Sequence, residues 1–471
     1  MKPFVLLNIF LIGFGLTRAQ SSWDLEQCIS YALKHNISLK QSAINNEINK
    51  NNSDQSKASI LPSLNAGANH VYNFGKTIDR FTNTFADNRV LSQNFFLSSS
   101  VVLWSGLSQY NNMKGNEYNY LSGVEKLKQQ ENDLSLGVAN AYIGVIFSEE
   151  LVKISKNQYT ITKEQLDRTQ KLVNAGSVAK SVEFDIKAQL ANEEVNVTSA
   201  ENNYQLSMLN LTQLMNFDSV TNFSISRPEL NIPESQLLEN NINGVYELSL
   251  KNQPSIKSGE YAILSSEKFL AASRGRYSPS LTFNASLGTG TSELAKDILG
   301  VNYTGYRPSG DFTRKGDTVY SPITELVTKK TPFADQFKNN VNKSVGFTLT
   351  IPLFNGLQSV TNVKNAKLAA TNARFAQDLT KQNLYKNIVQ AQTNAKAALN
   401  KYNATKLSVD AANESFKYAQ QKFNAGVISS FDFNSAKTRL FAAESNLLQA
   451  KYDYVFKLKV LDYYQGKPLG F

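Results

Sequence analysis

The strongest constraint in this chain of 471 residues is a long segment without helix breakers near its C-terminal end. Residues 357–425 contain neither glycine nor proline and are rich in Ala, Lys, Gln, Leu and Asn. Because glycine and proline disfavour helix interiors most, the segment predicts one continuous helix. With a rise of about 1.5 Å per residue it would be roughly 100 Å long, which exceeds the usual helix of a globular domain.

Apolar side chains follow a heptad spacing along this predicted helix. Steps of four and three residues alternate, which is the pattern of a helix that packs against others as a coiled coil. Alanine fills much of this seam and would let helix axes approach closely. The seam positions are Leu384, Ile388, Ala391, Ala395, Ala398, Tyr402, Thr405, Val409, Ala412, Phe416, Ala419 and Phe423.

The chain also carries an internal repeat. At an offset of 250, residues 103–107, 174–176 and 187–194 match 353–357, 424–426 and 437–444, whereas 62–64 match 279–281 at an offset of 217. The second copy therefore holds 33 additional residues between positions 279 and 353. So long a period indicates a duplicated architecture rather than a solenoid. Each half is expected to contain a helix, two strands joined by a loop, a very long helix, a glycine turn and a further helix.

Four segments alternate between apolar and small or polar residues. They are residues 64–74, 95–104, 281–288 and 345–353, and 95–104 alternates least cleanly. The alternation predicts strands of about ten residues. A strand with one apolar and one polar face fits a transmembrane β-barrel with lipid outside and water inside. A soluble sandwich has the same pattern, but the long helices and the signal peptide favour the barrel. Gly75–Ser92 and Thr289–Lys343 are expected to be loops at its outer mouth.

Four strands cannot close a barrel, and an open sheet edge is not tolerated in lipid. Two chains would supply eight strands, whose interior side chains would fill, whereas three would supply twelve and leave a lumen. We therefore expect a mixed, mainly α protomer that joins other copies into a hollow tube, part β and part α.

The N-terminus has the features of a secretory signal peptide over residues 1–19. Lys2 provides a positive charge, residues 4–16 are almost wholly apolar, and small residues at 17 and 19 mark a cleavage point. No later apolar run is long enough for a transmembrane helix. The single cysteine, Cys28, lies in no convincing lipobox and is expected to be a buried helix thiol.

The residues carry no recognisable catalytic chemistry. One cysteine and two histidines exclude a disulfide framework and a zinc site of clustered His and Cys. The glycines at 75, 288 and 290 do not complete a phosphate-binding or dinucleotide-binding motif, and no G-x-S-x-G occurs. We therefore expect no enzyme, no cofactor and no metal site.

Charged residues also give no sign of a site. The adjacent carboxylates Glu149-Glu150 and Glu193-Glu194 are expected on solvated helix faces. Lys and Arg total 49 against 39 Asp and Glu, but the basic residues are spread along the helices. A nucleic-acid partner is therefore not expected.

The order and spacing of these features resemble the TolC family of outer-membrane channels, which serve tripartite efflux pumps and type I secretion. The resemblance rests on the duplicated plan, the Pro-Ser-Leu entry to the first strand of each half and the junction at residues 353–357. It also rests on the Ala-Gly turns followed by residues 181–183 and 431–433. It covers essentially the whole mature chain, and residues 74–79 resemble the branch from Bacteroidota-type bacteria.

The resemblance implies a homotrimer with a twelve-stranded barrel in the outer membrane, continued by a periplasmic α-helical barrel. Its partners would be outer-membrane lipid, a periplasmic adaptor and an inner-membrane transporter. The implied organisation is a signal peptide (1–19), an N-terminal equatorial segment with the first-repeat helix (20–61), a β-hairpin (62–106), a long helical hairpin (107–216), an equatorial connector with the second-repeat helix (217–278), a second β-hairpin with an extracellular loop (279–354), a second helical hairpin (355–464) and a tail (465–471).

The same resemblance assigns the periplasmic end. The hairpin tips at Gly176 and Gly426 are expected to meet the adaptor. In family members a carboxylate six residues after the second tip glycine narrows the entrance, and Asp432 occupies that place here. Three copies of Asp432 would then form a ring of like charge near the axis. Alternatively, Asp432 caps the helix that follows, because acidic residues are favoured at helix N-termini.

Three further residues complete the expected gate. Ser435 stands where a second carboxylate is often found. In the first repeat Val182 occupies the position equivalent to Asp432, with Glu183 and Asp185 beside it. The chain is thus expected to be a passive export duct in the outer membrane. A secreted structural coiled-coil protein is the alternative, although it leaves the four strands unexplained. Neither the cargo nor the choice between efflux and protein secretion can be read from the residues.

Overall fold

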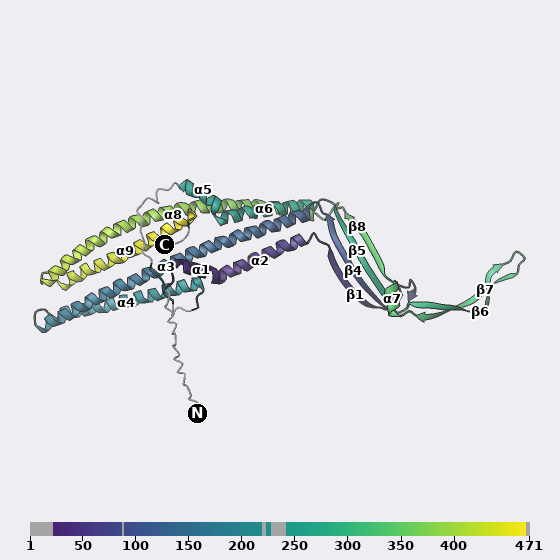
Figure 1. The fold of residues 1–471 in the computed structure, drawn as a ribbon, viewed down its shortest axis with the longest axis horizontal. Coiled ribbons are helices and arrows are strands. Elements are labelled where there is room, and N and C mark those ends of the chain that lie inside the picture. The colour runs from purple at the N-terminus through teal and green to yellow at the C-terminus, as the bar shows by residue number, and fades with distance from the viewer. Residues whose placement is uncertain (1–21, 87–88, 219–222, 228–241, 468–471) are drawn as a thin grey trace, which may run out of the picture. The chain divides into compact units, whose positions relative to one another are not determined.

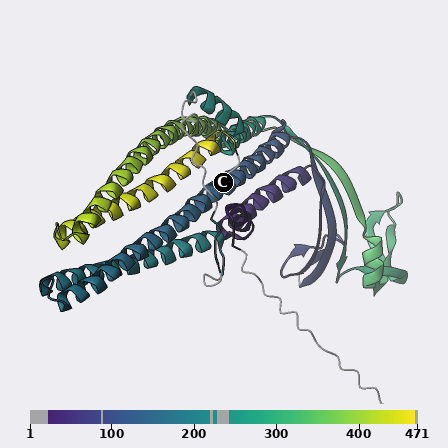
Figure 2. The ribbon, with the colours of Figure 1, turned by 60° about the vertical axis from the view of Figure 1, so that its left-hand side comes forward.

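The computed structural model describes residues 22–86, 89–218, 223–227 and 242–467 (Figures 1 and 2). The expected signal peptide at residues 1–19 lies outside the described residues. The chain forms two compact units. One comprises residues 1–50, 118–263 and 371–471, and the other comprises 51–117 and 264–370. Four helices have residues in both units.

The helices reproduce the two offsets of the sequence repeat. α1 (Leu25–His35) and α2 (Ile37–Ala58) return 217 residues later as α5 (Ile242–Asn252) and α6 (Pro254–Gly275). α3 (Ser108–Asn174) and α4 (Lys180–Met215) return 250 residues later as α8 (Gln358–Asn424) and α9 (Ser430–Tyr464). In Figures 1 and 2, α3 runs beside α4 and α8 runs beside α9. The predicted duplication is therefore confirmed at the level of helices.

The predicted continuous helix is confirmed as α8, which has 67 residues, and α3 has the same length. The first five seam positions of α8, from Leu384 to Ala398, are buried, whereas those from Tyr402 to Phe423 are half-buried. One chain alone therefore covers only part of the seam. Among the helices of the described residues, none is apolar over a length sufficient to span a membrane.

The largest apolar cluster of the described helices joins α1, α3, α4 and α9. Cys28 lies fully buried in it, as predicted, and burial raises the pKa of its thiol to about 12. The Tyr142 hydroxyl donates to the carbonyl oxygen of Ser226 at 2.6 Å, and the backbone N–H of Ser226 donates to the carbonyl of Trp23. These bonds hold the segment before α1 against α3.

The four predicted strands are confirmed as one antiparallel sheet. Its order is β1-β4-β5-β8, so β1 and β8 are the edges. A register shift in β4 between Val102 and Trp104 explains why the sequence alternates poorly there, because a bulge exchanges the faces of successive side chains. The strands are β1 (Ser63–Asn73), β4 (Val90–Trp104), β5 (Ser280–Ser292) and β8 (Asn342–Thr350).

The expectation of simple loops between the strands was wrong. The second loop holds a long hairpin of β6 (Lys296–Phe312) and β7 (Thr318–Lys330), followed by α7 (Phe333–Asn339). The first holds the short pair β2 (Thr77–Ile78) and β3 (Phe85–Ala86). The long hairpin escaped sequence reasoning because both of its faces are exposed, so no apolar face forces its residues to alternate.

Candidate functional site

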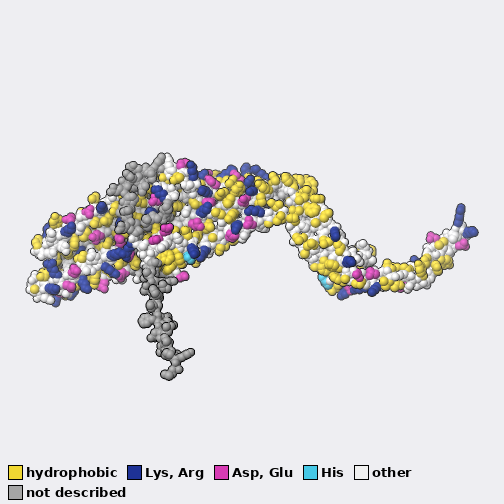
Figure 3. All heavy atoms as spheres, in the orientation of Figure 1, with side chains coloured by type: hydrophobic (Ala, Val, Ile, Leu, Met, Phe, Trp, Pro, Cys, Tyr) yellow, Lys and Arg dark blue, Asp and Glu magenta, His cyan; other side chains and the backbone are white. Residues whose placement is uncertain are grey.

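The sheet has one apolar and one polar face. On the apolar face, Leu97 of β4 lies between Ala66 of β1 and Leu287 of β5, and Phe283 faces Phe347 of β8. Hydrophobic side chains gather over these strands in Figure 3. The opposite face carries mainly short polar side chains and glycine, with the ring of Phe96 lying over Gly67. Its members include Asn65, Asn69, Asn94, Ser98, Ser100, Asn284, Ser286, Ser344, Gly346 and Thr348.

The apolar face has the height of a membrane. From Phe95 to Trp104 the strand advances nine residues, or about 30 Å, and a tilt of about 40° would reduce this to about 23 Å along the membrane normal. The band of an outer-membrane barrel is about 25 Å tall and has aromatic residues at both ends. Here Trp104 and Phe354 are exposed at the end that leads into α3 and α8, and Tyr72 is exposed at the other.

Polar side chains on the second face bond to one another across strands. Asn284 donates to Thr348 at 3.1 Å, and the hydroxyls of Ser286 and Ser344 share a hydrogen bond of 2.7 Å. None of the four is charged, so this face can be hydrated without the cost of burying an ion. Such a surface suits the wall of a water-filled lumen.

The two tip glycines adopt the left-handed conformation that the turns require. Their φ angles are +70° at Gly176 and +73° at Gly426. The Gly176 N–H donates to the carbonyl of Val173 at 2.9 Å, and the Gly426 N–H donates to that of Phe423 at 3.0 Å. Each long helix therefore ends in a glycine cap that satisfies its last carbonyls.

Asp432 takes part in the cap of α9. Ser429 is the N-cap, and its hydroxyl donates to the Asp432 carboxylate at 2.7 Å and accepts from the Asp432 N–H at 3.2 Å. The Asp432 side chain is nevertheless exposed. The capping role considered from the sequence is present, and the carboxylate keeps an accessible charge.

The other candidate gate residues divide into two groups. The Glu183 carboxylate lies 2.6 Å from the Lys187 ammonium on the same helix, and this hydrogen bond lowers the pKa of Glu183. Asp185 and Ser435, by contrast, line one groove of about 550 Å³ between α4 and α9. In that groove Arg439 donates to the Ser435 hydroxyl at 3.0 Å.

A buried ion pair near the tips was missed. The Lys437 side chain of α9 is 2% exposed; its ammonium lies 3.5 Å from the Glu193 carboxylate of α4. It also donates to the Gln158 carbonyl of α3 at 3.2 Å and to the hydroxyl of Thr162. Burial lowers the pKa of Lys437. The expectation that Glu193 lies on a solvated face was wrong, because α3 and α9 cover it.

The sequence contains a signal for Lys437. Phe433, Lys437 and Leu440 follow the spacing of four and three residues that marks a buried helix face, and both apolar neighbours are buried.

The adjacent carboxylates Glu149 and Glu150 both accept hydrogen bonds. Arg227 donates to Glu149, and the Tyr452 hydroxyl donates to Glu150 at 3.1 Å.

A sheet with an apolar face of membrane height, joined to very long helix hairpins, defines the class of outer-membrane channel proteins. A model of the outer membrane efflux protein family matches residues 28–216 and 245–466, so the chain belongs to this family. The predicted resemblance is thereby confirmed. The chain is an outer-membrane channel for efflux or type I secretion, and the family is one of channels rather than enzymes.

Individual relatives are distant but cover most of the chain. Outer membrane protein TolC of Escherichia coli K12 is 23% identical over 463 residues, which are 96% of this chain and 83% of TolC. The alkaline protease secretion protein AprF of Pseudomonas aeruginosa is 19% identical over 343 residues, 73% of this chain and 63% of AprF. The Campylobacter jejuni CmeC outer membrane channel superposes with a TM-score of 0.75 at 17% identity, covering 94% of this chain and 85% of CmeC.

Proposed function

We propose that three copies of this chain join their sheets edge to edge into a twelve-stranded barrel in the outer membrane. The observation that carries the proposal is the open sheet with one apolar face and two unpaired edges, β1 and β8. In lipid every backbone N–H and C=O at those edges needs a partner. Pairing β8 of one copy with β1 of the next satisfies both edges, and twelve strands leave room for a lumen.

The helices would extend this barrel through the periplasm. The half-buried seam of α8 between Tyr402 and Phe423 supports further helix packing there, because other copies would complete its burial. Substrate would pass along the polar face of the sheet without any reaction. The free energy for transport would come from an inner-membrane transporter.

The hairpin tips would dock a periplasmic adaptor. Val427 and Phe431 are 71% and 79% exposed beside Gly426, and Phe184 is exposed in the first turns of α4. Phe431 also lines the groove of Asp185 and Ser435, so an exposed apolar side chain lies beside polar groups there. A helical partner recognises such a surface through apolar anchors and a polar rim.

Asp432 would control ion passage at the entrance. Three carboxylates around one axis repel each other, attract cations and oppose a tightly shut state. The hydrogen bond from Ser429 leaves this charge in place. Glu183 is held by Lys187, so it would contribute less charge to the lumen than Asp432.

The native mass in mild detergent tests assembly, and planar-bilayer conductance tests the ring. A mass of three chains is expected, and a stable monomer in the outer membrane would contradict the barrel.

Asp432→Asn removes the charge but keeps an oxygen that accepts from Ser429, whereas Ser429→Ala removes the cap and keeps the charge. Cation preference should fall in the first variant and persist in the second. If the Asp432→Asn variant keeps the same cation preference as the Ser429→Ala variant, Asp432 has only the capping role.

A further inference from the structure

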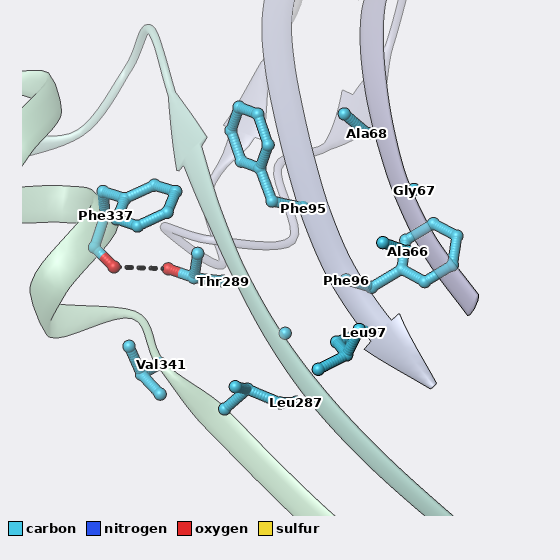
Figure 4. Close-up of a pocket in the computed structure, with 11 residues that line it drawn as sticks. Ala66, Gly67, Ala68, Phe95, Phe96, Leu97, Leu287, Thr289, Phe337 and Val341 are labelled. Carbon is cyan, nitrogen blue, oxygen red and sulfur yellow. Dashed lines mark hydrogen bonds between the residues drawn. The ribbon is translucent and has the colours of Figure 1, made fainter. Parts of the chain in front are cut away.

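The inserted helix α7 lies on the apolar face of the sheet (Figure 4). The ring centroids of Phe333 and Phe337 are 6.3 and 5.4 Å from that of Phe95 in β4. The Thr289 hydroxyl of β5 donates to the Phe337 carbonyl at 2.6 Å. Both α7 phenylalanines remain about half exposed. The helix therefore adds an apolar ridge to a face that meets lipid in the proposed barrel.

Polar bonds fix α7 in this place. The buried Gln336 side chain accepts from the Ser292 N–H at 2.8 Å and donates to the carbonyls of Ser292 and Thr331 at 3.1 and 3.0 Å. Just beyond the helix, Asn340 donates to the Gly290 carbonyl at 2.7 Å. Because these groups pair with one another, the space beside α7 is preformed.

That space is an apolar pocket of about 530 Å³ between α7 and the strands β1, β4 and β5. Its side chains include Ala66, Ala68, Leu97, Leu287, Phe337 and Val341, which Figure 4 shows around it. The only polar side chain of the lining, Thr289, donates its hydroxyl proton to Phe337. Water would find few partners here, so the pocket suits a hydrocarbon chain.

Two lysines are neighbours, in sequence or in strand register, of residues that line the pocket. Lys338 follows the lining residue Phe337 in the last turn of α7, and Lys343 lies opposite the lining residue Leu287 in the sheet register. Both side chains are exposed. Asp335 is the acidic residue of α7 and lies in its first turn. An apolar pocket beside two lysines is complementary to an amphiphile with anionic head groups.

We propose that this pocket binds an acyl chain of a phosphorylated outer-leaflet lipid of the lipid A class, with its phosphates near Lys338 and Lys343. The inference rests on the proposed function, which places the apolar face in lipid and α7 at the external end. A second copy is a poorer occupant, because copies join through the backbone edges of β1 and β8, whereas this pocket lies over the apolar side chains of β1, β4 and β5.

The test is native mass spectrometry of the full protein released from nanodiscs that contain lipid A, phosphatidylglycerol or phosphatidylcholine. Up to one retained lipid A per chain is expected, with little phosphatidylcholine. Ala68→Phe fills the pocket and should lower retention at least about fivefold. Leu64→Phe, on the same face of β1 but outside the pocket, is the matched control and should leave retention unchanged.

A second pair of variants tests the head-group contacts. Lys338→Gln with Lys343→Gln should reduce the preference for lipid A over phosphatidylcholine, whereas Lys329→Gln with Lys330→Gln in β7 should not. Equal retention of lipid A by the Ala68→Phe and Leu64→Phe variants would refute the pocket as the binding site. Equal retention of phosphatidylglycerol and lipid A would overturn the assignment to lipid A. A protein that conducts as a trimer but retains no lipid refutes this inference alone, whereas failure to insert refutes the proposed function.

Discussion

The two helix hairpins are copies at an offset of 250 residues, yet their returning helices begin differently. α4 begins after Ala179, which makes no side-chain cap. α9 begins after Ser429, which forms a reciprocal capping box with Asp432. The glycine turns that precede them have nearly the same φ angle. Turn geometry was thus retained in both copies, while the stabilisation of the helix start was not.

The lysines of the two hairpins differ even more. Lys187 is exposed and pairs with Glu183 of its own helix, whereas the equivalent Lys437 is buried against α3 and α4. Glu183 is replaced in the second copy by Phe433, whose ring stacks on Phe423 at 4.8 Å. Phe433 is buried in that contact, and Lys437 lies one turn later on the same face of α9, which points into the interior. Equivalent positions therefore acquire different roles through the residues that face them.

The largest expected effect is the difference in folding stability between variants of Lys437 and Lys187. Lys437→Met leaves Glu193 buried without its cation and should destabilise the helical unit by about 3 kcal/mol. Lys187→Met removes an exposed pair and should lower the stability far less. The measurement is the guanidinium midpoint of the helical circular dichroism signal. Adding Glu193→Leu to Lys437→Met should recover most of the loss, because no unpaired charge then remains. Equal losses in the two single variants would refute the assigned difference.

The second prediction concerns the caps. Ser429→Ala should destabilise the start of α9 by about 1 kcal/mol, because it leaves helix N–H groups without an acceptor. Ala179→Ser introduces a preferred N-cap residue at the equivalent place and should stabilise α4 by up to about as much. Amide hydrogen exchange in the first turn of each helix would report both changes. Faster exchange in α4 after Ala179→Ser would mean that the added hydroxyl does not cap.

The smallest expected effect lies in the Glu183–Lys187 pair. Lys187 lowers the pKa of Glu183 in the folded chain, so the pair favours folding above the ordinary glutamate pKa. That contribution disappears as the pH falls through the lowered pKa, because the carboxyl is then protonated in both states. A carboxyl ¹³C titration should show the Glu183 pKa rising toward its ordinary range in Lys187→Met. An unchanged Glu183 pKa would mean that Lys187 is not the group that lowers it.

Part of the candidate site could be found from the sequence. Glycines 176 and 426 were located by their place at the end of long helical patterns, and the capping alternative for Asp432 followed from its spacing. The sharing of one groove by Asp185 and Ser435 could not be anticipated, since they belong to helices from different repeats. Their proximity depends on how α4 packs beside α9.

The sequence by itself determined the duplicated order of elements, the continuous long helix of the second repeat and the four strands with their two faces. These features depend on residues close together in the chain, through helix propensity, glycine turns and alternation. Only the tertiary structure decided the burial of Lys437, which bonds to Gln158 at 279 residues' separation. It also decided the seating of α7 over β4. Both result from contacts between distant segments, which no local pattern specifies.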